Sequence, residues 1–299
     1  MNIKELLIEG SEKLKNENID ESILKAKLIL CYILKVNKEY LIIHSNDEMN
    51  EKIKKKYNNY INELISGKPL QYITNKQEFM GMDFYVDENV LIPRPDTEIL
   101  VEEAIKISNK NKLKKILDLC TGSGAIGISC SKYLNNVEVT ASDISEKALR
   151  IAKINAEKNN IEIAFIKSDL FDDINNKFDI IVSNPPYIKT NVIKKLEPCV
   201  QREPLIALDG GESGLDFYKR IIENAPNYLN ENGYLCLEIG YDQKNEVEEL
   251  IKNTNKYYDI YCKKDLGGNN RIIIARLMPA VRKEWFLNVF FCRGKGRTK

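Results

Sequence analysis

Residues 115–127 read Lys-Ile-Leu-Asp-Leu-Cys-Thr-Gly-Ser-Gly-Ala-Ile-Gly, an apolar run that leads directly into a glycine-rich turn. The run has the length of a strand, and the residues after Gly124 are typical of a helix. Glycines at a strand-to-helix turn let a ligand approach the backbone and leave helix N–H groups facing it. The turn is therefore a candidate ligand site, although a glycine-rich turn on its own also serves packing in many α/β proteins.

Apolar runs and helical patterns alternate through the chain beyond about residue 113. Helical stretches over 145–158 and 216–229 separate several of the runs. This alternation favours a largely parallel sheet with helices on both faces, an α/β fold of the Rossmann-like kind. The predicted strands cover 115–119, 137–142, 163–167, 178–183, 234–239, 257–262 and 271–275.

The first 70 residues have a different pattern, with helical periodicity and little glycine or proline. Ile23, Ala26, Leu30 and Leu34 recur at three- and four-residue steps, which predicts one amphipathic helix. A second helix is expected over 51–65, before Gly67 and Pro69. Residues 1–72 are therefore predicted to form a helical bundle.

The segment 73–97 is predicted to be a β-hairpin linker, because it alternates loosely and ends in Pro93-Arg94-Pro95, which forbids a helix. The next helix is expected to begin after Asp96 or Thr97, both good N-cap residues. The α/β domain then spans 98–276. The basic tail over 277–299 is predicted to be disordered, with a cloning artefact or a docking segment as the alternatives.

Composition excludes several classes of protein. Hydrophobic residues make up 43% and charged residues 30%, as in ordinary soluble proteins, and 45 basic residues nearly balance 44 acidic ones. A protein whose main role is to bind nucleic acid is expected to carry an excess of basic residues, which this chain lacks. The seven cysteines form no C-x-x-C pair, which indicates reduced thiols. The chain is expected to be cytoplasmic, with no membrane segment, no metal and no histidine-based catalysis, since His44 is the only histidine.

Acidic residues at the strand ends suggest which ligand the turn would bind. Asp143 ends the next strand 19 residues after Gly124, where a carboxylate can accept hydrogen bonds from ribose hydroxyls. Asp118 would repel a pyrophosphate and suits an α-amino group instead. A ligand with both groups is S-adenosylmethionine. Asp169 could accept a hydrogen bond from the adenine amino group, or it could simply cap a helix.

The strand over 178–183 runs into Asn184-Pro185-Pro186-Tyr187. The Asn184 side-chain oxygen and the Pro185 carbonyl can both accept hydrogen bonds from one planar –NH2 group, and Tyr187 can form an aromatic wall. The alternative is an ordinary Asn-Pro turn. Two acceptors would position an amide or exocyclic amine nitrogen for attack on a sulfonium methyl group and stabilise its developing positive charge.

These residues resemble the release factor glutamine methyltransferases of the HemK/PrmC type. Asn-Pro-Pro-Tyr alone is shared with amino methyltransferases that act on DNA and RNA. The narrower similarity, over roughly residues 1–276, lies in several further blocks. They are 67–73 (Gly-Lys-Pro-Leu-Gln-Tyr-Ile), 78–81 (Glu-Phe-Met-Gly), 90–98 (Val-Leu-Ile-Pro-Arg-Pro-Asp-Thr-Glu), 202–204 (Arg-Glu-Pro), 208–211 (Leu-Asp-Gly-Gly) and 214–215 (Gly-Leu).

The resemblance implies a seven-stranded class I methyltransferase sheet with an antiparallel last strand. It also implies an N-terminal domain that binds a peptide chain release factor, whose Gly-Gly-Gln glutamine is methylated on the side-chain nitrogen. The predicted catalytic and substrate-binding residues are Asn184, Pro185, Pro186 and Tyr187. The predicted donor-binding residues are Asp118, Cys120, Thr121, Gly122, Ser123, Gly124, Asp143, Asp169, Leu170 and Asn184.

Three alternatives remain open at this point. The acceptor could be a glutamine of a ribosomal protein, or the amino group of a nucleic-acid base, which would need base flipping and a positively charged groove. The chain could also bind the donor without catalysis, as an inactive module. The protein is expected to be a monomer that binds release factors, with no direct nucleic-acid specificity.

Overall fold

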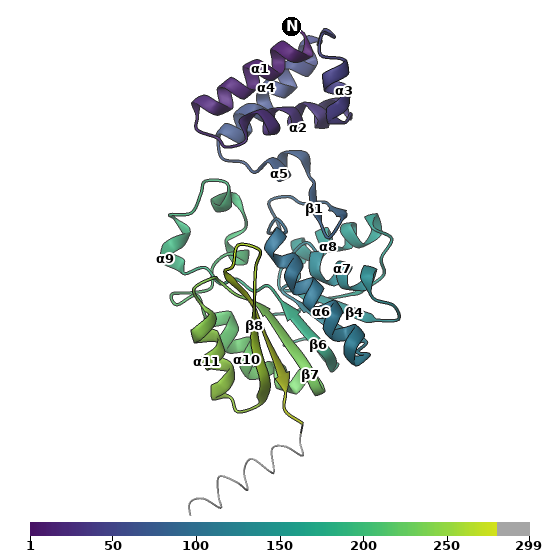
Figure 1. Ribbon diagram of the computed structural model, residues 1–299, viewed down its shortest axis with the longest axis vertical. Helices are drawn as coiled ribbons and strands as arrows, with labels where there is room; N and C mark the ends of the chain where they lie inside the picture. Colours follow the sequence, from purple (N-terminus) through teal and green to yellow (C-terminus); the bar gives the residue numbers. More distant parts are fainter. Residues whose placement is uncertain (280–299) are drawn as a thin grey trace, which may run out of the picture.

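The computed structural model describes residues 1–279, which form a helical unit, a short hairpin and a seven-stranded sheet with flanking helices (Figure 1). The predicted tail over 277–299 lies outside the described residues from position 280 onwards. Its first residue, Leu277, still belongs to the last strand. Within residues 1–279, no helix combines the length and the apolar character that crossing a membrane requires.

The helical unit packs around a buried cluster that includes Leu6, Leu14 and Tyr57. Three of its helices begin after an asparagine, at positions 2, 37 and 50, whose side chain accepts a hydrogen bond from the backbone N–H three residues on. The helices are α1 (Ile3–Asn16), α2 (Ser22–Leu34), α3 (Lys38–Ile43), α4 (Glu51–Ile65) and α5 (Leu70–Thr74).

The predicted apolar face of α2 is only partly buried. Ala26 and Leu30 are fully buried, whereas Ile23 is 62% exposed, so the prediction is wrong at that position. Ile23 lies on the first turn of α2, where it lines a shallow surface groove with Ile42. The predicted helical periodicity is correct. The first turn of α2, however, extends beyond the buried cluster of the helical unit, against which the rest of the helix packs.

The linker contains a hairpin of two three-residue strands, β1 (Gln77–Phe79) and β2 (Met82–Phe84). Beyond it the chain reaches a 3-10 turn, η1 (Pro95–Thr97), and then α6 (Glu98–Asn111). Thr97 occupies the N-cap position of α6, as the sequence predicts, but its side chain makes no capping bond. Instead, Asp96 pairs with Arg271 and the Thr97 hydroxyl donates to Glu238.

The seven strands lie in the order β5-β4-β3-β6-β7-β9-β8, with β9 antiparallel to both of its neighbours. This arrangement confirms the predicted Rossmann-like sheet with an antiparallel last strand. The bounds are β3 (Lys115–Leu119), β4 (Glu138–Asp143), β5 (Ala164–Lys167), β6 (Phe178–Ser183), β7 (Leu229–Glu238), β8 (Tyr257–Lys264) and β9 (Asn270–Leu277).

The start of β7 is the largest error among the predicted strands. The sequence predicts a strand from residue 234, but β7 begins at Leu229, immediately after the preceding helix. The polar stretch Asn230-Glu231-Asn232-Gly233 is typical of a turn, and Asn232 does have a positive φ of 61°. Leu229 nevertheless pairs with Phe178 of β6. The register between β6 and β7 shifts after this pair, between Phe178 and Ile180.

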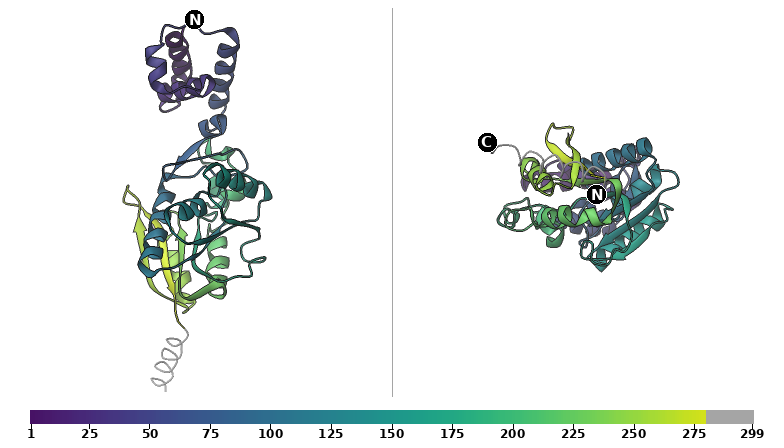
Figure 2. Two further views of the ribbon diagram at one scale, coloured as in Figure 1. Left: turned by 90° about the vertical axis from the view of Figure 1, so that its right-hand side faces the viewer. Right: turned by 90° about the horizontal axis from the view of Figure 1, so that it is seen from below.

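Helices cover both faces of the sheet (Figure 2). One face packs against α6, α7 (Ala125–Tyr133) and α8 (Glu146–Lys158), and the other against α10 (Asp216–Tyr228) and α11 (Lys244–Asn253). Alternate strand residues supply the two cores: Ile116 faces the first and Leu117 the second. The short helix α9 (Thr190–Ile193) lies in the loop after β6, at the end of the sheet nearest the helical unit (Figure 1).

The close approach of α1 to α4 gives a testable consequence for Gly10. A Cβ atom there would overlap the hydroxyl oxygen of Tyr57, which is fully buried. Alanine normally stabilises a helix relative to glycine. Here, overpacking reverses the sign, and we expect Gly10→Ala to lower the free energy of unfolding by about 1–3 kcal/mol in a denaturant titration. Glu12→Ala, at an exposed position of the same helix, is the control; equal stability of the two variants would contradict this packing.

Candidate active site

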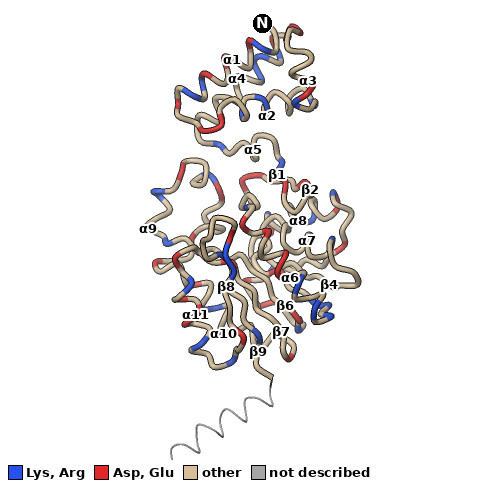
Figure 3. The backbone as a smooth tube through the Cα atoms, viewed as in Figure 1, with Lys and Arg blue, Asp and Glu red and all other residues tan. Residues whose placement is uncertain are grey.

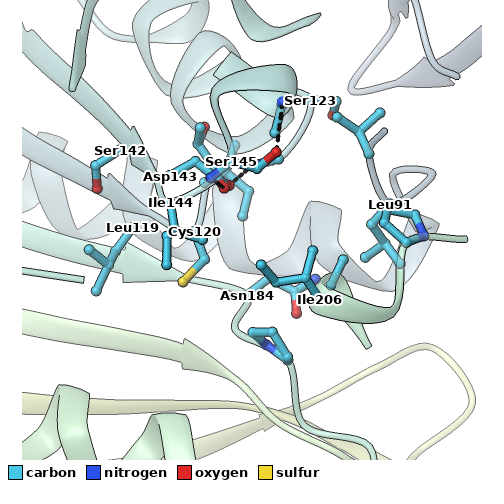
Figure 4. Close-up of a pocket in the computed structure, with 18 of the residues that line it drawn as sticks. Leu91, Leu119, Cys120, Ser123, Ser142, Asp143, Ile144, Ser145, Asn184 and Ile206 are labelled. Carbon is cyan, nitrogen blue, oxygen red and sulfur yellow. Dashed lines mark hydrogen bonds between the residues drawn. The ribbon is translucent and has the colours of Figure 1, made fainter. Parts of the chain in front are cut away.

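The carboxyl ends of three adjacent strands place the predicted site residues together. Leu119, the last residue of β3, is the register partner of Ser142 on β4 and of Ser183 on β6. The buried Ser183 hydroxyl also donates a 2.6 Å hydrogen bond to the Leu119 carbonyl. The residues that follow these three positions along β3, β4 and β6 are Cys120, Asp143 and Asn184. All three line one cavity (Figure 4). This cavity lies where the strand order reverses, the usual ligand site of such sheets.

The turn after β3 is held in a conformation that brings its backbone to the cavity. Cys120, Gly122 and Gly124 have positive φ angles of 62°, 55° and 83°. A side chain at Gly124 would also lie 2.8 Å from Ile128 and 3.1 Å from Ala152, so glycine permits the packing of α7 on α8. Cys120, Thr121, Gly122 and Ser123 line the cavity, whereas Gly124 does not.

Asp118 does not line the cavity, which disfavours the predicted direct contact with the amino group of a ligand. It is fully buried beneath the turn, where Oδ2 accepts hydrogen bonds from the Thr121 hydroxyl at 2.5 Å and the Gly127 N–H at 2.8 Å. Its Oδ1 is buried without a partner among residues 1–279. Burial raises the pKa of this carboxyl to about 7. Asp118 therefore stabilises the conformation of the turn through these hydrogen bonds.

Asp143 lines the cavity and also stabilises the turn. Its Oδ2 accepts a hydrogen bond from the Gly122 N–H at 2.9 Å, and its Oδ1 accepts one from the Ser145 N–H at 2.8 Å (Figure 4). Burial raises the pKa of the carboxyl, and these backbone bonds oppose that rise. Each carboxylate oxygen retains acceptor capacity, so a ribose hydroxyl can still bind here.

Asp169 and Leu170 line the cavity beyond β5. The partly exposed Asp169 carboxylate forms a 2.9 Å ion pair with Arg220 of α10, rather than capping a helix. Leu170 is buried and has a positive φ of 52°. Both residues line the same cavity as Cys120, Asp143 and Asn184.

The four residues after β6 divide into two pairs. Asn184 and Pro186 line the cavity, whereas Pro185 and Tyr187 do not. The Tyr187 hydroxyl instead points to Glu238, 3.4 Å from Oε1, and burial near this carboxylate raises the pKa of the phenol. The structure therefore gives no support to Tyr187 as an aromatic wall of the cavity. Asn184 donates from Nδ2 to the Thr97 hydroxyl oxygen at 3.3 Å.

The remaining wall of the cavity comes from residues that the strand-end argument alone does not identify. The linker contributes Leu91, Pro93, Arg94 and Thr97, and the loop after α9 contributes Pro204, Ile206 and Ala207. Figure 4 shows Leu91 and Ile206 on the side of the cavity away from β4. Two sequence signals fall on this wall. One is the pair of linker prolines, because an extended segment can lie across the ends of a sheet; the other is the family resemblance of the blocks 90–98 and 202–204.

An ion pair between a half-buried arginine and a buried glutamate joins these two parts of the wall. Arg94 of the linker binds Oε1 of Glu203, whose Oε2 accepts a hydrogen bond from the Ile92 N–H at 3.1 Å. Glu203 is only 5% exposed; burial raises the pKa of its carboxyl, and Arg94 opposes that rise. Because the charge is paired and hydrogen-bonded, it holds the linker against the loop.

The buried amide of Asn155 makes a similar connection on the other side. From α8 it donates to the carbonyls of Ser123 and Tyr85, both at 2.9 Å, and accepts from the Tyr85 N–H at 2.6 Å. The hairpin linker and the turn after β3 are thus fixed to one side chain.

Comparisons with known proteins agree with this architecture. Residues 5–74 match the family model of the PrmC N-terminal domain, and residues 95–200 match that of the methyltransferase small domain. The release factor glutamine methyltransferase of Clostridium acetobutylicum is 43% identical over 281 residues, which are 92% of this chain and 98% of that protein. The enzyme of the same name from Clostridium botulinum is 41% identical over 283 residues, 92% of this chain and 99% of that protein.

A solved structure shares the fold at lower sequence identity. The catalytic domain of hMettl16, in complex with the MAT2A 3'UTR hairpin 6, superimposes with a TM-score of 0.54 at 18% identity. The match covers 71% of this chain and 83% of that one. At this identity the likeness shows a common methyltransferase fold and nothing about the acceptor.

The burial of Asp118 predicts a specific pH dependence of stability. Its folded-state pKa, about 7, lies above the ordinary value of 3.8, so its contribution is fully present below pH 4 and is lost as pH rises through 7. Asp118→Asn cannot titrate. Between pH 5 and 8, the unfolding free energy of the ligand-free protein should fall relative to this variant by roughly 3 kcal/mol. Parallel curves for the two proteins in urea titrations would show that this carboxyl does not titrate in that range.

Proposed function

This chain belongs to the release factor glutamine methyltransferase family, and we propose that it methylates the Gly-Gly-Gln glutamine of peptide chain release factors. The methyl group comes from S-adenosylmethionine and is transferred to the side-chain amide nitrogen. The proposal places the protein in the cytoplasm, where ribosomes release finished chains, and treats it as a monomer without a metal.

The observation that carries the proposal is the orientation of Asn184. Its Nδ2 donates to Thr97, so its Oδ1 is turned away from Thr97, and Asn184 lines the cavity. An acceptor here suits a ligand group that carries N–H donors, such as a carboxamide. The Pro185 carbonyl would be the second acceptor for the same –NH2 group; this role comes from the sequence pattern alone, because Pro185 is not among the residues that line the cavity.

Donor binding is assigned to the cavity side formed by β3, β4 and β5. The backbone of Cys120–Ser123 would hold the amino-acid portion, Asp143 the ribose hydroxyls, and Asp169 with Leu170 the adenine. These assignments are supported by the lining of one continuous cavity. They leave Asn184 at the end where the sulfonium methyl group would meet the acceptor.

Transfer requires the amide nitrogen to act as a nucleophile although its lone pair is delocalised. Bound S-adenosylmethionine would supply an electrophilic methyl group. Asn184 Oδ1 and the Pro185 carbonyl would hold both amide hydrogens, align the nitrogen and stabilise the positive charge that grows on it. As the N–C bond forms, the C–S bond breaks. The alkylated nitrogen then loses a proton, which needs no strong base because methylation makes that proton acidic.

The helical unit is the proposed recognition surface for the release factor. It lies beyond the same end of the sheet as α9 (Figure 1), and Arg202 of the loop after α9 donates a 2.9 Å hydrogen bond to the Ser66 carbonyl. Acidic and basic residues are interspersed over both parts of the molecule (Figure 3). This distribution favours a protein acceptor over a nucleic acid.

Methyl transfer from labelled S-adenosylmethionine to purified release factor tests the proposal. One methyl group should appear on the glutamine of the loop peptide in mass spectrometry, and none on a substrate with Gly-Gly-Ala in its place. Label in RNA or in a ribosomal protein, with none in the release factor, would replace the proposed acceptor with one of the alternatives.

The Asn184→Ala variant should separate binding from chemistry. Loss of one acceptor in the transition state should lower kcat by at least about a hundredfold, whereas the Kd for S-adenosylmethionine should change by less than about threefold. Asn176→Ala, at an exposed position outside the cavity lining, is the matched control. Normal turnover by the Asn184 variant would remove this residue from the acceptor site.

A further inference from the structure

Three side chains from distant parts of the sequence form a hydrogen-bonded relay behind the acceptor site. Glu238, the last residue of β7, is 1% exposed, and its Oε2 accepts a 2.6 Å hydrogen bond from the Thr97 hydroxyl. The Thr97 oxygen in turn accepts the 3.3 Å hydrogen bond from Asn184 Nδ2. The Tyr187 hydroxyl lies 3.4 Å from the other oxygen of Glu238.

From this relay we propose that Thr97 and Glu238 are positioning residues that fix the Asn184 amide and make the site select glutamine over glutamate. The inference rests on the proposed function, since it deepens the role given there to Asn184. Neither residue is assigned a contact with the reacting nitrogen. Both act through Asn184.

The direction of each hydrogen bond follows from the chemistry of the groups. An ionised carboxylate has no proton to give, so the single proton of the Thr97 hydroxyl is committed to Glu238. The Thr97 oxygen can then only accept from Asn184. Of the two ends of the Asn184 amide, only the –NH2 group can donate. The carbonyl end is therefore left for the ligand.

Without the relay, the two orientations of a side-chain amide have nearly the same shape and compete on hydrogen bonds alone. Turned one way, Asn184 presents an acceptor to the cavity; turned the other way, it presents a donor. A glutamine offers two N–H donors, whereas a glutamate carboxylate offers only acceptors. Orientation at Asn184 thus decides which of the two ligands is bound.

A purely structural role explains Glu238 poorly. A buried carboxylate is costly, and an apolar residue at the end of β7 would serve packing at least as well. Thr97 likewise does not use its hydroxyl to cap α6. Its hydroxyl instead joins Glu238, behind the cavity wall, to Asn184, which lines the cavity; polar groups arranged in this way are typical of a functional site.

The charge of Glu238 depends on its surroundings. Burial raises the pKa of its carboxyl to about 7, Thr97, Arg271 and Tyr187 oppose this rise, and Asp96 adds to it. The hydroxyl of Tyr218 on α10 donates to the backbone carbonyl of Glu238 at 2.8 Å, not to its carboxylate. The carboxylate is mainly ionised at pH 8, where the relay has the direction described above.

The test compares release factors that carry Gly-Gly-Gln or Gly-Gly-Glu. Their Kd values are measured at pH 8 with S-adenosylhomocysteine bound, by calorimetry, so that no turnover occurs. The ratio of the two Kd values cancels contacts made elsewhere on the release factor. Wild type should favour the glutamine form, and Thr97→Val, which keeps the shape but removes the hydroxyl, should lower that preference by roughly tenfold or more.

Two further variants separate positioning from folding. Thr97→Ser keeps the hydroxyl and should restore the preference. Glu238→Gln is nearly isosteric and gives the relay a group that can donate as well as accept, so it should also lower the preference. It carries the test alone if Thr97→Val fails to fold, as judged by circular dichroism and by the Kd for S-adenosylhomocysteine.

An unchanged Kd ratio in the folded Thr97→Val and Glu238→Gln proteins would overturn the relay. Failure of the proposed function looks different, because wild type itself would then neither prefer the glutamine form nor methylate it.

Discussion

The hydrogen-bonded register of β3 between β4 and β6 is the constraint on which the rest of the site depends. Leu119 pairs with Ser142 on one side and Ser183 on the other, and the Ser183 hydroxyl also binds the Leu119 carbonyl. The proposed donor turn (residues 120–123, after β3) and the proposed acceptor loop (residues 184–187, after β6) therefore leave the sheet at the same level. A slip of one register position would exchange the faces of every side chain on the strand and separate the two halves of the site.

Three hydrogen-bonded connections hold the linker against this edge of the sheet. Asn155 ties the hairpin linker to the donor turn, and the Arg94–Glu203 pair ties the linker to the loop after β6. The relay from Glu238 through Thr97 then reaches Asn184. Each connection joins the linker to the α/β domain, so the segment between the helical unit and the sheet is itself a wall of the cavity.

Local patterns predicted the fold well, because apolar periodicity and turn residues act over a few positions. They identified the seven strands of the sheet, but missed the start of β7, where a turn-like polar stretch pairs within the sheet. The positions of Cys120, Asp143 and Asn184 at the ends of their strands also predicted that they lie together at one edge of the sheet. The directions of Asp118 and Tyr187 could not be predicted, since they depend on tertiary burial. The Thr97–Glu238 contact joins residues 141 positions apart and has no local signal.

A crystal structure with S-adenosylhomocysteine and a Gly-Gly-Gln peptide of a release factor would show whether Asn184 holds the acceptor amide. We expect the glutamine amide nitrogen within about 3.2 Å of both Asn184 Oδ1 and the Pro185 carbonyl oxygen, facing the sulfur. A glutamine bound outside this cavity, or one that meets the –NH2 end of Asn184, would contradict it.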